Sequence, residues 1–374
     1  MRIKKLAFWD NLREWRFEPI YFSNLALLVG VSGVGKTQIL KSILSLQQIA
    51  NGTSLNGLGW DITFATLNNI EYRWQGEFET KENLTFILND DGETNEFRIV
   101  SENLFRDGNA VIQRTPNEII LKGKTTPKLS PFQSVVEILK QEEDISPVQQ
   151  CFDRIIYSDN STSFNEIYRM PLRVTSRYFN KDLGLETVQR SGMSIMLKLA
   201  LIARHYPSVF NRIKFQFRAL FPHVEDLKIE ELEDRNNSSC CYLPIQMKEK
   251  NVNNWIFQDN ISSGMLKTLV YISELYLLPE GRVILIDEVE YSLGINCMDV
   301  VTLWMVENSN IQFIFTSHHP YIINNIGMEY WKIVTRKGGV VTAIDAKDLN
   351  LGQSRHQAFM QLINLEEYSE GIKV

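Results

Sequence analysis

The sequence predicts an α/β fold built on a mixed sheet, and three features support this. An apolar run meets a glycine-rich turn and then a helix-like pattern in "LALLVGVSGVGKTQILKSI", residues 25–43. Two more apolar strands, "RVILIDEVE" and "IQFIFTSHHP", each follow a helical stretch, a rhythm typical of a parallel sheet. Short alternating segments separated by turn residues over 61–122 indicate an antiparallel meander.

The N-terminal elements follow from the same patterns. Residues 1–30 alternate and then become wholly apolar, so we expect two strands, the second buried. A helix should run from about Lys36 to Ala50, and residues 51–60 should form a loop before the meander.

Helices dominate the middle of the chain. "SPFQSVVEILKQ" and "SPVQQCFDRII" predict capped helices, and residues 184–221 predict helix interrupted near Pro207. A hairpin over 330–346 should close the fold. We expect one domain over residues 1–374. Its predicted parts are an N-terminal lobe at 1–124, a helical insertion at 125–260 and a C-terminal lobe at 261–374.

Composition excludes several classes of protein. A chain of 374 residues with 44% hydrophobic content can bury a sizeable core. Its net charge of −6 gives no global basic signature for nucleic acid. No apolar segment resembles a signal peptide or a membrane span, and the four cysteines include no CxxC pair. We therefore expect a cytoplasmic protein with reduced thiols and no membrane partner.

The glycine-rich turn fits the pattern G-x-x-x-x-G-K-[ST]. Glycines allow successive backbone N–H groups to face an anion at the positive end of a helix. Lys36 would reach the β- and γ-phosphates of a nucleotide, and the Thr37 hydroxyl would ligate Mg²⁺. The predicted contacts are Gly30, Ser32, Gly33, Val34, Gly35, Lys36, Thr37 and Gln38.

Two carboxylates follow the strand "VILI". Ligands of parallel α/β sheets bind at the carboxyl ends of the strands, where Asp287 and Glu288 would lie. We predict that Asp287 holds Mg²⁺ directly or through water, and that Glu288 acts on the attacking water as a base or positioning group.

Two further segments offer candidate contacts to phosphate. "ISSGM" precedes an amphipathic helix, so Ser262, Ser263 and Gly264 would form a second anion site. It could serve the nucleotide of another subunit, although a plain serine cap has the same pattern. "TSHHP" follows an apolar strand and offers His318 as a contact to the γ-phosphate.

These four segments occur in one order: "GVSGVGKT", "ISSGM", "VILIDEVE" and "TSHHP". The order resembles the ABC-type ATPase head shared by SMC proteins, RecF and OLD-family ATPases. More narrowly, it is similar to stand-alone AAA-family ATPases of bacterial anti-phage systems such as Septu, PARIS and retron-associated modules. The signature departs from "LSGGQ", since Ser263 replaces a glycine and Met265 a glutamine.

The resemblance implies ATP and Mg²⁺ as cofactors and a homodimer, or a higher even-numbered oligomer, closed around ATP. Ser262 and Gly264 of one subunit would complete the site around Lys36 of the other. The chain offers no pattern for coiled-coil arms or a nuclease domain. We therefore expect a sensor ATPase that regulates a separate effector, a nuclease or toxin, in anti-phage defence.

Two other functions stay open. A RecF-like repair ATPase would bind DNA across the dimer, using basic residues of the middle helices such as Arg190, Arg204, Arg212, Lys214 and Arg218. A solvated helical face explains those residues more simply. A transporter ATPase subunit is compatible with the motifs, but the long antiparallel segment and "TSHHP" favour the SMC and RecF branch.

Overall fold

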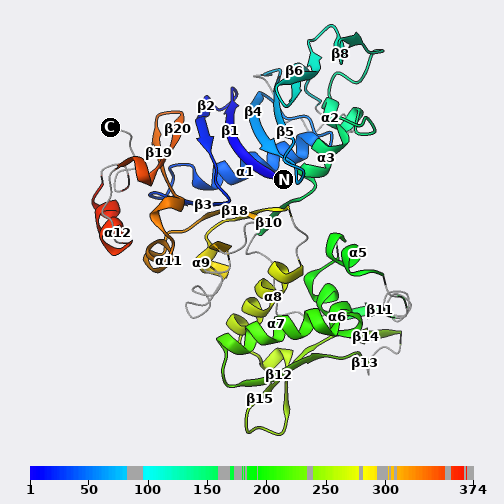
Figure 1. Ribbon diagram of the computed structural model, residues 1–374, viewed down its shortest axis with the longest axis vertical. Coiled ribbons are helices and arrows are strands. Elements are labelled where there is room, and N and C mark those ends of the chain that lie inside the picture. The colour runs from blue at the N-terminus through cyan, green and yellow to red at the C-terminus, as the bar shows by residue number, and fades with distance from the viewer. Residues whose placement is uncertain are drawn as a thin grey trace. The chain divides into compact units, whose positions relative to one another are not determined.

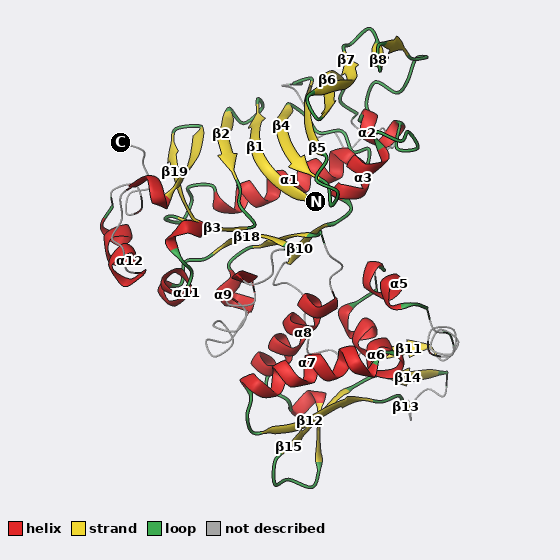
Figure 2. Cartoon of the chain, viewed as in Figure 1, coloured by secondary structure: helices red, strands yellow, loops and turns green. Residues whose placement is uncertain are grey.

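Helices and strands follow one another along the chain much as the sequence predicts (Figures 1 and 2). The computed structural model describes residues 1–81, 96–158, 169–171, 179, 181, 183–191, 193–233, 239–277, 281–292, 302, 305–306, 310–349, 355–365 and 368. The chain divides into unit 1, residues 1–158, 281–288 and 305–374, and unit 2, residues 159–280 and 289–304. Each unit is described by itself.

Unit 1 is organised around a mixed sheet. Among the described residues its strands lie in the order β10-β17-β18-β3-β19-β20-β2-β1-β4-β5-β6-β7-β8-β9. Neighbours from β10 to β19 are parallel. These strands are β10 (Ile155–Ser158), β17 (Val283–Ile286), β18 (Gln312–Thr316), β3 (Leu25–Val29) and β19 (Trp331–Lys337).

The remainder of this sheet is largely antiparallel. Its strands are β20 (Val340–Asp345), β2 (Trp15–Tyr21), β1 (Arg2–Asp10), β4 (Leu58–Ala65), β5 (Glu71–Phe78), β6 (Ile99–Arg106), β7 (Asn109–Arg114), β8 (Ile119–Leu121) and β9 (Lys124–Thr125). From β4 to β9 each strand pairs with the next in sequence. This meander and the parallel strands confirm the predicted fold class. The predicted strand "LTFILND" lies outside the described residues.

Helix α1 (Lys36–Ala50) packs on the core of unit 1. Its residues Ile39, Leu40, Ile43 and Leu46 are buried at helical spacing, together with side chains of β1, β2 and β4. The short helices α2 (Val135–Ile138) and α3 (Ser146–Phe152) also contribute to this core. The core fixes where α1 begins, and therefore where the glycine-rich turn must lie.

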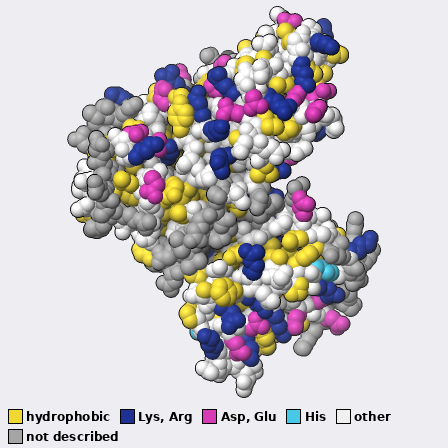
Figure 3. Space-filling model, in the orientation of Figure 1, with side chains coloured by type: hydrophobic (Ala, Val, Ile, Leu, Met, Phe, Trp, Pro, Cys, Tyr) yellow, Lys and Arg dark blue, Asp and Glu magenta, His cyan; other side chains and the backbone are white. Residues whose placement is uncertain are grey.

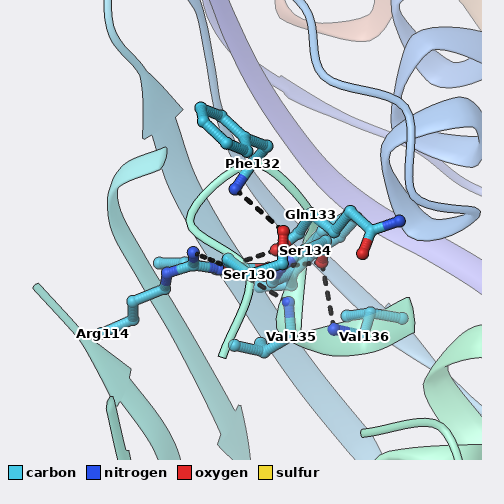
Figure 4. Close-up of polar contacts among 9 residues, drawn as sticks. Arg114, Ser130, Phe132, Gln133, Ser134, Val135 and Val136 are labelled. Atoms are coloured by element: carbon cyan, nitrogen blue, oxygen red, sulfur yellow. Dashed lines mark hydrogen bonds and ion pairs between the residues drawn. The ribbon is translucent and has the colours of Figure 1, made fainter. Parts of the chain in front are cut away.

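A buried ion pair joins the meander to the turn before α2. Glu102 on β6 and Arg114 on β7 are register partners, with side chains 0% and 3% exposed. Arg114 donates to the carbonyls of Ser130 and Gln133, both at 2.7 Å (Figure 4). Its Nη1 lies 3.3 Å from Glu102 Oε2. Glu102 also accepts from Trp74 Nε1, the Ser134 hydroxyl and the Val135 N–H. Glu102 and Arg114 therefore neutralise each other and bind the turn that precedes α2.

Arg114→Met should destabilise unit 1 strongly, because it leaves the Glu102 carboxylate buried without its cation. Breaking such a pair costs about 3–5 kcal/mol of unfolding free energy. Arg73→Met is the matched control, because Arg73 forms an exposed pair with Asp61 whose loss should cost about 1 kcal/mol or less. Urea denaturation measures the loss of unfolding free energy in both variants. Equal losses would contradict a stabilising role for the buried pair of Glu102 and Arg114.

Unit 2 combines helices with two small sheets. Its helices are α5 (Leu185–Arg190), α6 (Ile195–His205), α7 (Pro207–Leu220), α8 (Ser263–Leu277) and α9 (Val289–Ser292), with the 3₁₀ turn η1 (Gln258–Asn260). One sheet has the order β11 (Arg169–Pro171), β14 (Cys240–Tyr242) and β13 (Leu232–Glu233), the other β12 (Val224–Ile229), β15 (Ile245–Glu249) and β16 (Trp255–Phe257). Pro207 opens α7, which explains the predicted interruption.

Burial raises the pKa of Glu274 on α8 from 4.5 to about 7, opposed only in part by the charge of Lys198. The folded state therefore holds this proton over a pH range in which the unfolded chain releases it. The stability that this group contributes is complete below about pH 4.5 and is lost as the pH rises towards 7. Glu274→Gln should remove that decline, which thermal unfolding at about pH 5 and about pH 8 would detect. If the wild-type and Glu274→Gln proteins lost thermal stability in parallel as the pH rises, the raised pKa of Glu274 would be contradicted.

The rest of unit 1 follows β18. It comprises α11 (Pro320–Asn325), the 3₁₀ turns η2 (Met328–Tyr330) and η3 (Ala346–Leu349), and α12 (Arg355–Asn364). Within the described part of the chain, no helix is long and apolar enough to cross a membrane.

Candidate active site

Three neighbouring parallel strands of unit 1 end at one edge of the sheet. The order β17-β18-β3 brings Asp287, Thr316 and Gly30 to that edge, because each residue ends or directly follows its strand. The carboxyl edge of a parallel sheet is where ligands bind in α/β proteins. The phosphate loop and the acidic strand, more than 240 residues apart in sequence, thus contribute to one site.

Two glycines are required by the shape of the loop. Gly30 has φ +150°, and a Cβ there would lie 2.5 Å from the carbonyl oxygen of Val334 on β19. Gly35 has φ +108° and caps α1, with the Val341 side chain 3.1 Å from the position of a Cβ. Both conformations disfavour residues with a side chain. These two glycines therefore allow the loop to pack closely against β19 and β20.

The start of α1 has the properties of an anion site. The first N–H groups of a helix have no partner inside the helix, and they lie at its positive end. No acidic residue occupies the first turn of α1 to compete with an anion. Ser32, Gly33 and Gln38 are exposed around this start, whereas Val34 is buried in the core and anchors the loop.

Lys36 extends back over the loop. Its side chain is 5% exposed, and Nζ donates to the carbonyls of Gly30 at 2.7 Å and Val31 at 2.8 Å. A lysine ammonium is a point charge with three donors, so these bonds can be exchanged for bonds to phosphate oxygens. The position fits the predicted role of Lys36.

Hydroxyl groups connect the loop to the acidic strand. Thr37 Oγ1 donates to Asp287 Oδ1 at 3.1 Å, and Thr316 Oγ1 donates to the same oxygen at 2.7 Å. Thr316 Oγ1 in turn accepts from the Glu288 N–H at 2.7 Å. The structure thus brings together the predicted residues Lys36, Thr37, Asp287 and Glu288 at one edge. Sequence reasoning did not include Thr316 among the site residues.

The donor set suits Mg²⁺. This ion uses one or two protein oxygens and completes its shell with water and phosphate oxygens. Thr37 and Asp287 are oxygen donors held together by a hydrogen bond. Among the described residues no cluster of three or more His, Cys, Asp or Glu side chains forms a dedicated metal site. The oxygen donors Thr37 and Asp287 fit a cation that is bound together with a nucleotide.

His318 is exposed just beyond the end of β18. Its neighbours are held to the backbone: the Ser317 hydroxyl accepts from the His319 N–H at 3.0 Å, and His319 Nδ1 accepts from the Tyr321 N–H at 3.2 Å, which caps α11. The segment that carries His318 is therefore fixed at the same edge as Asp287 and Glu288.

The predicted signature segment lies in unit 2, at the start of α8. Ser262, Ser263 and Gly264 are exposed, and the Ser262 hydroxyl accepts from the Met265 N–H at 3.2 Å as an N-cap. A Cβ on Gly264 would meet no atom within 4 Å. Both readings of this segment, an N-cap and an open anion site, are compatible with its geometry.

A hollow of about 760 Å³ lies at the loop edge of the sheet in unit 1. Its lining includes the β1–β2 turn, Trp15 and Val340. Strand directions place this turn at the same edge as the loop, because β1 runs in the same direction as β3. Trp15 is partly buried; it stacks on Phe8 and lies against Phe17 in a tilted arrangement.

Three basic residues of the middle helices have partners within unit 2. Lys214 pairs with Asp226 at 2.8 Å, Arg212 lies over the Tyr276 ring, and Arg204 lies over the Phe179 ring. The Arg190 side chain lies outside the described residues. On the face drawn in Figure 3, Lys and Arg side chains are interspersed with Asp and Glu over the described surface. These contacts do not favour a nucleic-acid groove.

The glycine loop before α1, the acidic strand and the hydroxyl-rich end of β18 lie together at one edge of the sheet, as the resemblance to the ABC-type ATPase head implies. Residues 216–324 match the family described as "AAA domain, putative AbiEii toxin, Type IV TA system". The match begins within α7 and ends within α11, so it includes the signature, the acidic strand and "TSHHP" but not the phosphate loop.

Solved structures with a similar fold include SMC head domains. One, bound to the C-winged helix domain of ScpA, has 16% identity and a TM-score of 0.46, covering 92% of this chain and 97% of its own. The SMC head domain from Thermotoga maritima has 16% identity and a TM-score of 0.45, with 92% and 99% covered. The head domain with a coiled coil and joint from Pyrococcus yayanosii has 12% identity and a TM-score of 0.44, with 97% and 99% covered. No curated protein matches the chain by sequence.

Proposed function

We propose that this protein binds ATP with Mg²⁺ at the edge formed by β3, β17 and β18, and hydrolyses it to ADP and phosphate. One observation carries the proposal: the phosphate loop with Lys36 is joined through Thr37 to Asp287 and, through Thr316, to Glu288. An anion site, a cation site and a candidate base therefore share one edge.

Each residue has a role in binding. The N–H groups of Gly33 to Gln38 surround the phosphates, and Lys36 exchanges the two loop carbonyls for β- and γ-phosphate oxygens. Thr37 and Asp287 would hold Mg²⁺, and the ion would supply positive charge beside the phosphate oxygens. The nucleoside occupies the hollow beside Trp15.

Glu288 acts on the water that attacks the γ-phosphorus. A bond forms between the water oxygen and phosphorus, while the bond from phosphorus to the bridging oxygen breaks and its electron pair stays on ADP. The Glu288 carboxylate accepts one water proton and later releases it to solvent or phosphate. His318 donates a hydrogen bond to the γ-phosphate.

The binding of ATP closes a homodimer, or a higher even-numbered oligomer. Ser262, Ser263 and Gly264 of a second copy contact the γ-phosphate held by Lys36. The exposed start of α8 and the open space above Gly264 support this use, since a phosphate could approach the backbone there.

The cycle of closure and reopening regulates a separate effector, a nuclease or toxin, in a cytoplasmic anti-phage system. The family matched over residues 216–324 is described as "AAA domain, putative AbiEii toxin, Type IV TA system", which supports a place in a system that contains a toxin. The contacts of Lys214, Arg212 and Arg204 within unit 2 argue against the alternative, DNA binding across the dimer.

A native mass spectrum tests this regulatory role. The Glu288→Gln protein would be co-expressed with the products of neighbouring genes and measured with and without Mg-ATP. We expect an even-numbered homomer that carries a second protein. A homomer that retains nucleic acid instead would favour the repair alternative, and a monomer unaffected by ATP would overturn the shared site.

A further inference from the structure

Glu288 has an unusual backbone conformation. Its φ is +50°, in the left-handed region, which residues with a side chain seldom adopt. Such a conformation costs about 1–3 kcal/mol and persists only when the surroundings fix it. The contact that fixes it must therefore lie close to the Glu288 backbone.

One such contact is the Thr316 hydroxyl. Thr316 is the last residue of β18 and is 1% exposed. Its Oγ1 lies 2.7 Å from Asp287 Oδ1 and 2.7 Å from the Glu288 nitrogen. A carboxylate can only accept and an N–H can only donate, so the hydroxyl must donate to Asp287 and accept from Glu288. The Thr316 hydroxyl thus donates its hydrogen to Asp287 and accepts a hydrogen bond from Glu288.

The two bonds connect residues with different roles. Asp287 Oδ1 also accepts from Thr37 at the start of α1. Beside the peptide bond between Asp287 and Glu288, one buried oxygen, Thr316 Oγ1, adds a hydrogen-bonded link between the proposed metal-binding pair and the backbone N–H of the candidate base. Because the N–H of Glu288 is held, rotation of this peptide, which would redirect the carboxylate, breaks a hydrogen bond.

We propose that Thr316 is a positioning residue for hydrolysis, which acts by fixing the backbone of Glu288 relative to Asp287. The inference rests on the proposed ATPase function. Thr316 is 1% exposed and bonds to Asp287 and Glu288, so its loss should slow turnover through misplacement of Glu288. ATP binding depends on Lys36 and the loop, and should be retained.

Three variants test the proposal. Thr316→Val keeps the shape and removes both hydrogen bonds, and Thr316→Ser restores the hydroxyl. Thr342→Val is the matched control, because Thr342 is a buried strand threonine whose hydroxyl bonds to Thr335 at 2.7 Å. Thermal unfolding of each variant separates lost stability from lost turnover.

We expect Thr316→Val to lower kcat about tenfold or more, towards the contribution of about 10² to 10⁴ made by a positioned base, while KM for ATP changes less than about twofold. Thr316→Ser should recover most of kcat, and Thr342→Val should leave it near the wild-type value. In the Glu288→Gln background, Thr316→Val should lower the residual rate less than about twofold, because no base remains to be positioned.

An unchanged kcat, a loss confined to KM, or the same loss in both backgrounds would overturn the role of Thr316. If the wild-type protein does not hydrolyse ATP, or if Lys36→Ala hydrolyses it equally well, the proposed function fails and this inference fails with it. The two failures are thus distinguishable in one set of assays.

Discussion

Replacing Lys36 by alanine should abolish ATP binding. Lys36 supplies the buried ammonium at the phosphate loop, where it now donates to two loop carbonyls at 2.7 and 2.8 Å. Each bond to a charged partner contributes about 1.5–3 kcal/mol, so losing two weakens binding by at least about a hundredfold. Isothermal titration with Mg-ATP measures the loss.

Lys41→Ala provides the matched control for this prediction. Lys41 lies on the same helix, but its side chain is exposed, so the substitution removes the same charge away from the loop. Lys36→Met adds a second test, because it keeps the buried aliphatic stem and removes only the ammonium. Wild-type affinity in either Lys36 variant would contradict the assigned site.

Glu288→Gln should retain ATP but stop turnover. The amide cannot take a proton from water, and a positioned general base contributes about 10² to 10⁴ in rate. The backbone of residue 288, and with it the Thr316 bond, is unaffected by the change. Release of labelled γ-phosphate in a single turnover measures the rate, and sedimentation of the same sample measures assembly.

The binding variant and the turnover variant serve as controls for each other. Lys36→Ala should neither bind ATP nor assemble, whereas Glu288→Gln should bind ATP and accumulate as a closed dimer. Normal turnover by Glu288→Gln would remove Glu288 from the catalytic role and leave the ATP-binding assignment intact.

Local patterns predicted the elements around the phosphate loop well. The helix expected from Lys36 to Ala50 has those bounds, because its glycine start and apolar spacing are both local signals. The first 30 residues contain three strands where the sequence predicts two. The missed turn between β1 and β2 contains no glycine or proline, and Glu14 adopts φ +55° there.

Long-range contacts explain other differences. "SPFQSVVEILKQ" predicts a full helix, yet α2 covers only Val135–Ile138. Arg114 binds the carbonyls of Ser130 and Gln133, which holds the preceding residues in an extended turn. Glu102 and Arg114 alternate along their strands like ordinary exposed residues, so no sequence pattern reveals that they are a buried pair.

The site was predictable where its residues belong to compact motifs. The phosphate loop, Asp287 and Glu288 meet because β3 and β17 run parallel on either side of β18. The role of Thr316 depends on contacts with residues almost 30 positions away, which the sequence does not encode locally. Its one signal is a polar residue at the end of the otherwise apolar run "FIFT".

The most direct test of the ATP site is the structure of the Glu288→Gln protein bound to Mg-ATP. We predict that the triphosphate lies along the loop from Gly30 to Thr37, with Lys36 Nζ bonded to phosphate oxygens and the ion beside Thr37 and Asp287. A triphosphate bound elsewhere, with Lys36 still bonded to the carbonyls of Gly30 and Val31, would contradict the account.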